Sequence, residues 1–226
     1  MHELKITMLG STGVGKTSLL TAMYEQFSSN IGKTDLQLIP DEESSEILQE
    51  RLIELKSLLD DFEVRGGVQA TAGEPTDLRS FIFKLGRRGK SPSLQLNFCD
   101  YPGGYHLAKA TPEKRQFVKD LLEECVAVLI AIDAPALMER GGRWNELINR
   151  PKQITDIFKT AYQDLDSPRL VIFAPVRCEK YMQTEKSSSE LIQRIKKEYK
   201  ELLDTFSSEA LLPNVVAVIT PVQTLG

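Results

Sequence analysis

Apolar residues recur along the chain with two periods, and the two periods alternate. A short apolar run at residues 4–9 predicts a strand, and apolar residues at helical spacing predict a helix over residues 17–27. Residues 78–85 and 93–99 predict two further strands. The segment 86–92 between them contains two glycines and a proline, which is typical of a hairpin, so we expect these strands to be antiparallel.

The second half of the chain continues the alternation. The pattern predicts strands at 126–132, 170–174 and 215–219, and helices at 111–124, 145–162 and 187–206. Strands that alternate with helices favour a mostly parallel sheet with helices on both faces. We therefore predict a three-layer α/β fold with a six-stranded, mostly parallel sheet that contains one antiparallel strand.

An insertion at about residues 35–75 follows the first helix of what we take to be a single domain, residues 1–226. Its residues 36–39 have the pattern of an extra strand, and residues 43–62 predict an amphipathic helix. The glycine-rich residues 65–77 predict an exposed loop. The apolar side of the helix either packs on its own sheet or docks a partner, and the pattern leaves both open.

The sequence ends at Gly226, just after the last predicted strand. Many domains of this architecture carry one more helix at that point. Either this protein differs, or the chain is the N-terminal part of a longer polypeptide, and we favour the second interpretation.

Composition narrows the class of protein. The chain is 41% hydrophobic and 27% charged, which permits a sizeable core, and its net charge of −4 argues against a broad nucleic-acid-binding surface. No apolar stretch is long enough for a transmembrane segment or a signal peptide. Cys99, Cys125 and Cys178 are scattered without metal-ligand spacing, so we expect buried, reduced thiols and a cytoplasmic location.

A phosphate-binding motif stands between the first predicted strand and the first helix. Residues 10–17 read Gly-Ser-Thr-Gly-Val-Gly-Lys-Thr, which matches Gly-x-x-x-x-Gly-Lys-Thr. Glycines let successive backbone N–H groups converge on an anion, and the helix start adds its positive dipole end. Lys16 can reach the terminal phosphates, and the Thr17 hydroxyl can ligate Mg²⁺. The predicted nucleotide-binding residues of this loop are Ser11, Thr12, Gly13, Val14, Gly15, Lys16, Thr17 and Ser18.

A second candidate, Asp100-Tyr101-Pro102-Gly103, follows the strand predicted at 93–99. Strand ends in an open α/β sheet face the ligand crevice. There the Asp100 carboxylate can hold Mg²⁺ through water, and the Gly103 N–H can meet a γ-phosphate. An ordinary turn uses the same residue types, but after a phosphate-binding loop we favour the functional interpretation.

These motifs resemble a known family. Gly10 to Leu20 is similar to the start of Ras-like small GTPases, and Asp100-x-x-Gly103 resembles the second phosphate motif of that family. The insertion and the sequence Asp-Tyr-Pro-Gly-Gly are more similar to bacterial members of the translation-factor-related GTPase class, including the double-GTPase type of conflict and signalling systems. The resemblance implies a P-loop NTPase fold, GTP and GDP as ligands, Mg²⁺ as cofactor and a protein effector.

The resemblance also implies a switch threonine before the second core strand, which closes over Mg²⁺ and the γ-phosphate and relaxes after hydrolysis. Two residues fit this role. We favour Thr71, within the glycine-rich loop, because similar insertions end in a loop with a threonine several residues before the strand. Thr76, which follows Pro75, is the alternative.

Guanine recognition in this family uses Asn/Thr-Lys-x-Asp after the fifth strand, where this chain reads Val-Arg-Cys-Glu at 176–179. The resemblance implies that Glu179 accepts two hydrogen bonds from guanine and that the stem of Arg177 lies over the base. The missing asparagine removes a contact to the P-loop, and a solvated turn is the competing interpretation. Gln223 and Thr224 match the family's Ser-Ala-Lys loop by position only.

The hydrolytic residue departs from the family pattern. Gly104 stands where Ras-like members place a water-orienting glutamine, and His106 lies one position beyond the histidine that some relatives use. A solvated loop histidine is the competing interpretation. Arg140 and Arg143 flank two glycines and are candidates for an arginine finger, against a solvated loop.

Three functions are consistent with these features. The first is a Mg²⁺-dependent guanine-nucleotide-binding switch with slow GTP hydrolysis, because the usual glutamine is missing. The second is a P-loop ATPase, which the departures at 176–179 favour. The third is a module that holds nucleotide with little hydrolysis while the insertion helix docks a partner.

Overall fold

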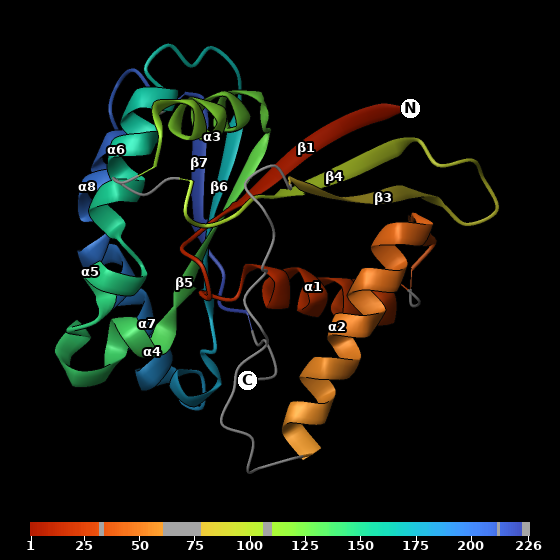
Figure 1. The fold of residues 1–226 in the computed structure, drawn as a ribbon, viewed down its shortest axis with the longest axis horizontal. Coiled ribbons are helices and arrows are strands. Elements are labelled where there is room, and N and C mark those ends of the chain that lie inside the picture. Colours follow the sequence, from red (N-terminus) through yellow and green to blue (C-terminus); the bar gives the residue numbers. More distant parts are fainter. Residues whose placement is uncertain (32–33, 61–77, 106–109, 212, 223–226) are drawn as a thin grey trace.

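A computed structural model describes residues 1–31, 34–60, 78–105, 110–211 and 213–222. Within these residues a seven-stranded sheet in the order β2-β3-β4-β1-β5-β6-β7 lies between two groups of helices (Figure 1). The strands are β1 (His2–Leu9), β2 (Leu36–Pro40), β3 (Arg79–Arg87), β4 (Leu94–Asp100), β5 (Ala127–Asp133), β6 (Arg169–Val176) and β7 (Val215–Ile219).

The sheet is mostly parallel, as the alternation of strands and helices predicts. β1 is parallel to β4 and β5, and β5, β6 and β7 continue in the same direction. β3 is antiparallel to both of its neighbours. The predicted hairpin joins β3 to β4 through a turn in which the Lys90 N–H donates to the Arg87 carbonyl at 3.1 Å.

The extra strand expected at 36–39 is confirmed as β2, and because it joins the main sheet, the predicted count of six strands is wrong. β2 pairs with β3 from Leu36, opposite Arg87, to Pro40, opposite Phe83. The terminal proline of this edge strand is tolerated because an edge strand leaves one row of N–H groups unpaired.

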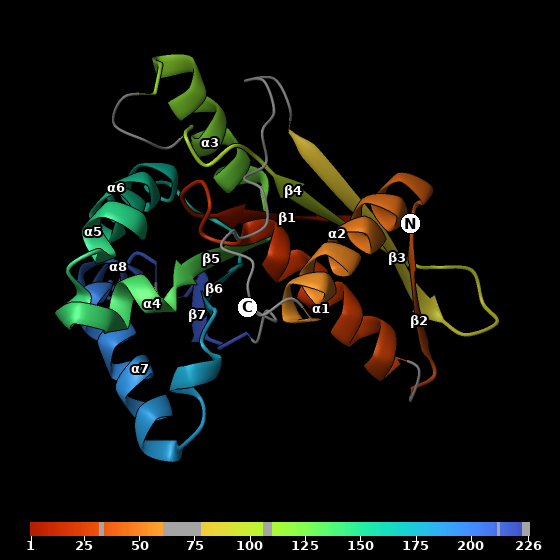
Figure 2. The same cartoon turned by 60° about the horizontal axis from the view of Figure 1, so that its bottom comes forward.

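The two faces of the sheet have separate hydrophobic cores. α1 and α2 cover one face, with Leu19, Leu20 and Leu48 packed on the sheet, and the other helices cover the opposite face (Figures 1 and 2). The helices are α1 (Lys16–Ile31), α2 (Glu42–Asp60), α3 (Pro112–Glu124), α4 (Ala134–Met138), α5 (Asn145–Ile148), α6 (Pro151–Ala161), α7 (Glu185–Glu198) and α8 (Lys200–Phe206), with 3₁₀ turns η1 (Glu139–Gly142) and η2 (Glu179–Tyr181).

Two predicted helices are each divided in two. The helix expected over 145–162 breaks at Arg150, which adopts φ 53° and ψ 50°. Proline disfavours the α conformation of the preceding residue, so α6 begins anew with Pro151 in its first turn. The helix expected over 187–206 is divided at Tyr199, whose φ of −104° and ψ of 19° lie outside the helical range.

The insertion is fixed to the body of the protein at the start of α2. Asp41 caps this helix by accepting a hydrogen bond from the Ser44 N–H at 2.9 Å. The Ser44 hydroxyl in turn accepts from the Ile82 N–H of β3 at 2.9 Å. Leu48, one turn further along, is fully buried. The first part of the insertion helix therefore packs on its own domain.

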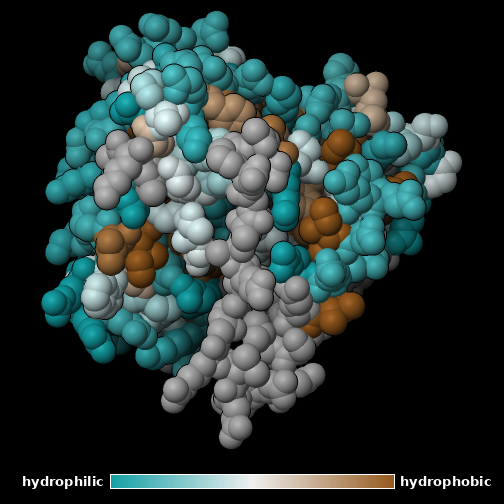
Figure 3. All heavy atoms as spheres, in the orientation of Figure 1, coloured by the Kyte–Doolittle hydropathy of each residue, from teal (hydrophilic) through white to brown (hydrophobic). Residues whose placement is uncertain are grey.

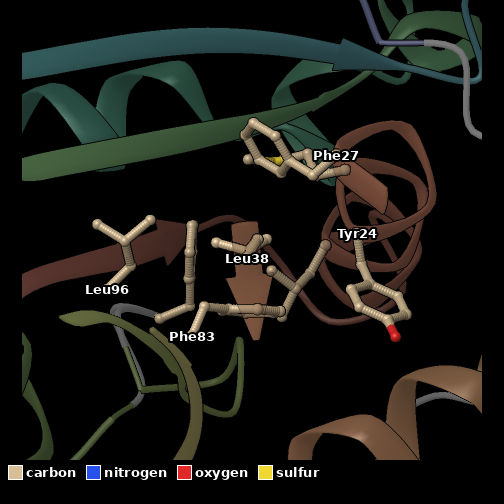
Figure 4. A pocket seen from close by; sticks show the side chains of 8 residues that line it. Tyr24, Phe27, Leu38, Phe83 and Leu96 are labelled. Atoms are coloured by element: carbon tan, nitrogen blue, oxygen red, sulfur yellow. The ribbon is translucent and has the colours of Figure 1, made fainter. Parts of the chain in front are cut away.

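A small apolar pocket lies where α1 meets β2, β3 and β4 (Figure 4). Tyr24 and Phe83 pack with ring centroids 6.0 Å apart, and Phe83 contacts Phe98 edge to face at 5.6 Å. Phe27, on the last turns of α1, is partly exposed at this pocket. Elsewhere on the face shown in Figure 3, hydrophobic side chains form small separate patches on a mostly hydrophilic surface.

The cysteine prediction is confirmed, because Cys99, Cys125 and Cys178 are all free and buried. Among the described helices, none is both long and apolar enough to span a bilayer.

The packing of α2 can be tested with two substitutions on the same helix. Leu48→Ala is expected to lower the free energy of unfolding by about 2–5 kcal/mol, because it leaves a cavity in a closed core. Ile53→Ala is the matched control, since Ile53 is 70% exposed and its loss should change stability by less than about 0.5 kcal/mol. Urea unfolding curves measure both, and equal effects would contradict this packing.

Candidate functional site

The P-loop connects the end of β1 at Leu9 to the start of α1 at Lys16. Two of its glycines adopt left-handed backbone conformations, Gly13 with φ 79° and Gly15 with φ 103°, which other residues rarely adopt. Val14 is fully buried between the two and fixes the loop to the core. The resulting turn directs the first backbone N–H groups of α1 toward a common point, as in anion sites at helix N-termini.

The Lys16 side chain folds back over this loop. Its ammonium group donates to the Gly10 carbonyl at 3.1 Å, and the residue is only 8% exposed. Burial lowers the pKa of Lys16, and the nearby Asp100 carboxylate raises it in part. The lysine is therefore a poorly solvated cation, and an anion bound over the loop would stabilise its charged form.

Asp100 reaches the P-loop because β4 lies beside β1 in parallel register, with Cys99 opposite Thr7. Its Oδ2 accepts a hydrogen bond from the Thr17 hydroxyl at 3.3 Å. Its Oδ1 is buried and, like the Ser11 hydroxyl, has no hydrogen-bond partner among the described residues. Burial raises the pKa of Asp100, while Lys16 and Thr17 lower it in part.

An unpaired buried carboxylate oxygen beside a threonine hydroxyl fits a small divalent cation. Mg²⁺ at nucleotide sites takes one or two protein oxygens, with phosphate and water oxygens as its remaining ligands. In the part of the chain that the structure describes, no three His, Cys, Asp or Glu side chains gather into a metal-binding group. The pair Thr17 and Asp100 fits a shared protein–nucleotide metal site better than a metal site built from protein ligands alone.

Gly103 lies directly against the P-loop. A Cβ atom on this glycine would stand 2.4 Å from the Thr12 nitrogen and 2.5 Å from the Ser11 carbonyl carbon. Because both neighbours are backbone atoms, any side chain here would push the two loops apart. The structure thus brings Gly103 to the loop that the sequence predicts to bind phosphate.

The residues after Gly103 are held by aromatic contacts. The ring of Tyr105 lies 6.3 Å from that of Tyr101 and 6.0 Å from that of Phe117 in α3, measured between centroids. The Tyr105 N–H also donates to the Pro102 carbonyl at 3.0 Å, which closes a turn. Segment 100–105 is therefore packed between the P-loop and α3.

The candidate base loop follows β6. Arg177 adopts a left-handed conformation with φ 53°, and its guanidinium pairs with the buried carboxylate of Asp133 at the end of β5. Cys178 is buried and its thiol donates to the Val222 carbonyl at 3.4 Å. Glu179 is half-buried at the start of η2. The loop therefore lies at the same sheet edge as the P-loop, and the contacts of Arg177 and Cys178 hold it to neighbouring segments.

Several predicted site residues lie outside the described residues: Thr71, Thr76, His106, Gln223 and Thr224. Of the two candidate finger arginines, Arg140 is in η1 with φ 47°, and the Arg143 guanidinium lies 5.7 Å from the Trp144 ring centroid.

The sequence interpretation overlooked Asp133. Like Asp100, it is an aspartate at the carboxyl end of a buried strand, so the same rule about strand ends in open sheets would have found it. Its partners Asn145 and Asn149, each 1% exposed, carried no comparable signal, because isolated asparagines are common in loops.

Comparison with solved structures identifies the fold. The signal recognition particle receptor SRb-GTP/SRX complex from Chaetomium thermophilum aligns with 99% of this chain and 91% of its own, at a TM-score of 0.54 and 15% identity. The Ski7 GTPase-like domain from S. cerevisiae, bound to GDP and inorganic phosphate, aligns with 99% of this chain at a TM-score of 0.51 and 15% identity. This chain spans 43% of that Ski7 chain. Neither a family model nor a curated protein sequence matches. The chain therefore has the fold of P-loop GTPases, while the low identity leaves function to the site.

Because Asp100 is buried, replacing its carboxylate by a neutral amide should raise the free energy of unfolding by an amount that depends on pH. Because its folded-state pKa is raised, the penalty for ionising it is absent below the unfolded value of about 3.9 and grows as the pH rises from that value toward the folded value. Asp100→Asn should therefore stabilise the nucleotide- and Mg²⁺-free protein at pH 7 but not at pH 3.5. Denaturant unfolding at both pH values measures this difference, and the surface substitution Asp164→Asn serves as control. If Asp100→Asn were no more stable than wild type at pH 7, ionisation of the buried carboxylate would not destabilise the fold.

Proposed function

We propose that this protein is a Mg²⁺-dependent guanine-nucleotide-binding switch that hydrolyses GTP slowly. The observation that carries this proposal is the group of buried Lys16, partly buried Thr17 and buried Asp100 at the N-terminus of α1, where one oxygen of Asp100 has no hydrogen-bond partner among the described residues. Such a group has unsatisfied capacity for one anion and one cation side by side, which is the chemistry of a metal-bound triphosphate.

In this proposal, residues 11–18 bind the phosphates through backbone N–H groups, and Lys16 neutralises the terminal phosphates. Thr17 and Asp100 hold Mg²⁺, whose positive charge screens the phosphate oxygens. The Gly103 N–H, on the segment packed against the P-loop, senses the γ-phosphate. Thr71 is the switch threonine, with Thr76 as the alternative.

Guanine preference rests on Glu179, with the Arg177 stem as one face of the base site and Gln223 and Thr224 beyond the last strand. The SRb structure with this fold contains GTP and the Ski7 structure contains GDP, which supports guanine as the base. An ATPase is the second candidate, because Val176 stands in place of the asparagine that ties this loop to the P-loop in guanine-specific members. Val176 is fully buried, so it contributes packing there and no hydrogen bond.

We further propose that the protein is cytoplasmic and binds a protein effector. Among P-loop GTPases, we propose that it is most similar to bacterial double-GTPase-type domains. The burial of Leu48 favours packing over partner docking for the first turns of α2. The remaining apolar side chains of the insertion stay candidates for the effector surface.

Calorimetric titration with GTP, GDP and ATP in Mg²⁺ tests the proposal. Guanine nucleotides should bind in preference to ATP. Lys16→Ala should weaken the binding of GTP by about 10- to 100-fold, because charge-assisted hydrogen bonds to phosphate are lost. Lys90→Ala, at an exposed lysine in the β3–β4 turn, is the matched control and should bind as wild type. Equal or preferential ATP binding would eliminate the guanine assignment, and no binding of any nucleotide would eliminate the function.

Hydrolysis should be slow because Gly104 offers no side chain to orient water. Single-turnover GTP hydrolysis by the isolated protein is expected at roughly 10⁻³ s⁻¹ or below, the range of unassisted small GTPases. His106→Ala should reduce this rate further if the histidine replaces the glutamine. A rate faster than about 1 s⁻¹ would contradict a slow switch.

A further inference from the structure

A buried polar network surrounds Asp133 at the carboxyl end of β5. The Asp133 Oδ1 accepts from the Ala136 N–H at 2.9 Å and so caps α4. Its backbone N–H donates to the Asn149 side-chain oxygen at 2.7 Å, and its carbonyl accepts from the Asn149 amide nitrogen at 3.1 Å. The Asp133 N–H, carbonyl and Oδ1 are thus hydrogen-bonded to Ala136 or Asn149, which leaves Oδ2 for another partner.

The network continues away from the sheet. Asn149 also donates to the Asn145 side-chain oxygen at 2.9 Å, and Asn145 donates to Glu198 of α7 at 3.3 Å. Glu198 in turn forms an ion pair with Arg194 at 3.3 Å. Since these contacts tie β5 to α5 and α7, the position of the Asp133 carboxylate is fixed from several directions.

The remaining oxygen, Asp133 Oδ2, pairs with the guanidinium of Arg177. The two side chains differ sharply in environment, because that of Asp133 is 4% exposed and that of Arg177 is 45% exposed. The arginine therefore has its charged head held at a buried anchor while part of its length stays at the surface. A free arginine would sample many rotamers, and its ordering on a bound base would cost conformational entropy.

We propose that Asp133 is a positioning residue that holds the Arg177 side chain flat as one face of the nucleobase site. This inference rests on the proposed function and adds a residue to it. A purine needs a flat and pre-ordered surface to stack on, and an arginine fixed by a carboxylate provides one at low entropic cost. Stacking is tolerant of base identity, so Asp133 sets the affinity for the nucleoside part, whereas Glu179 distinguishes guanine from adenine.

Asp133→Asn removes the charge with little other change. Asparagine has the same size and also caps helices well, so the contact to Ala136 is retained. The two contacts with Asn149 involve only the backbone of Asp133 and do not depend on the side chain. A matched control is Asp41→Asn, which makes the same change at the capping aspartate of α2.

The experiment measures the binding of GTP and of inorganic tripolyphosphate, both with Mg²⁺, to four proteins: wild type, Asp133→Asn, Arg177→Gln and the double variant. Each single variant should bind GTP about tenfold more weakly, because the stacking surface is no longer ordered before binding in Asp133→Asn and is lost in Arg177→Gln. The double variant should be no weaker than either single variant, because both act through one contact. Tripolyphosphate, which has no base, should bind all four proteins equally, and Asp41→Asn should bind both ligands as wild type.

Each other outcome has a definite meaning. Unchanged GTP affinity in Asp133→Asn, additive effects in the double variant, or equal weakening of GTP and tripolyphosphate would overturn the positioning role while leaving the proposed function intact. Arg177→Gln, a change at a half-exposed position, carries the test if Asp133→Asn does not fold. Wild-type protein that binds tripolyphosphate but not GTP would overturn the positioning role and the guanine assignment. Binding of neither ligand would overturn the proposed function itself.

Discussion

The position of β1 between two parallel neighbours is the constraint on which the site depends. β1 is followed by α1 on one face of the sheet, whereas its neighbours β4 and β5 are followed by helices on the opposite face, so a crevice opens at the carboxyl ends where these connections diverge. The P-loop follows β1, Asp100 ends β4 and Asp133 ends β5. One pairing pattern therefore brings the phosphate loop, the candidate metal ligand and the anchor of the base loop to one edge.

This arrangement places opposite charges in a poorly solvated position. Burial lowers the pKa of Lys16 and raises that of Asp100, so it disfavours the charged form of both groups. Each charge partly offsets this effect by stabilising the charged form of the other group. A bound triphosphate and cation would relieve both penalties. Such linkage means that ligand binding and folding stability are coupled, as expected for any ligand that binds only the native state.

The sequence predicted the features that depend on local patterns. The P-loop, the hairpin between β3 and β4 and the start of α3 follow from glycine spacing, turn residues and an N-cap, all of which act over a few residues. The extra strand at 36–39 was predicted from its local pattern, but its place at the edge of the main sheet was not, because it depends on a partner more than forty residues away in the chain. The break at Arg150 was missed because no apolar pattern records a left-handed conformation. The pair of Asp133 and Arg177 was missed because it joins the ends of two strands that are far apart in the chain.

The contact of Gly103 with the P-loop backbone also bears on how a signal would travel through the protein. Gly103 carries only a hydrogen atom where other residues carry a side chain, and the P-loop backbone occupies that space. At the other end of the same short segment, Tyr105 packs against Phe117 of α3. Packed interiors yield little under compression. Because segment 100–105 is packed against the P-loop at one end and against α3 at the other, it links the position of the P-loop backbone to that of α3. Under the proposed function, a change at the P-loop on nucleotide binding is therefore expected to reach the surface of α3.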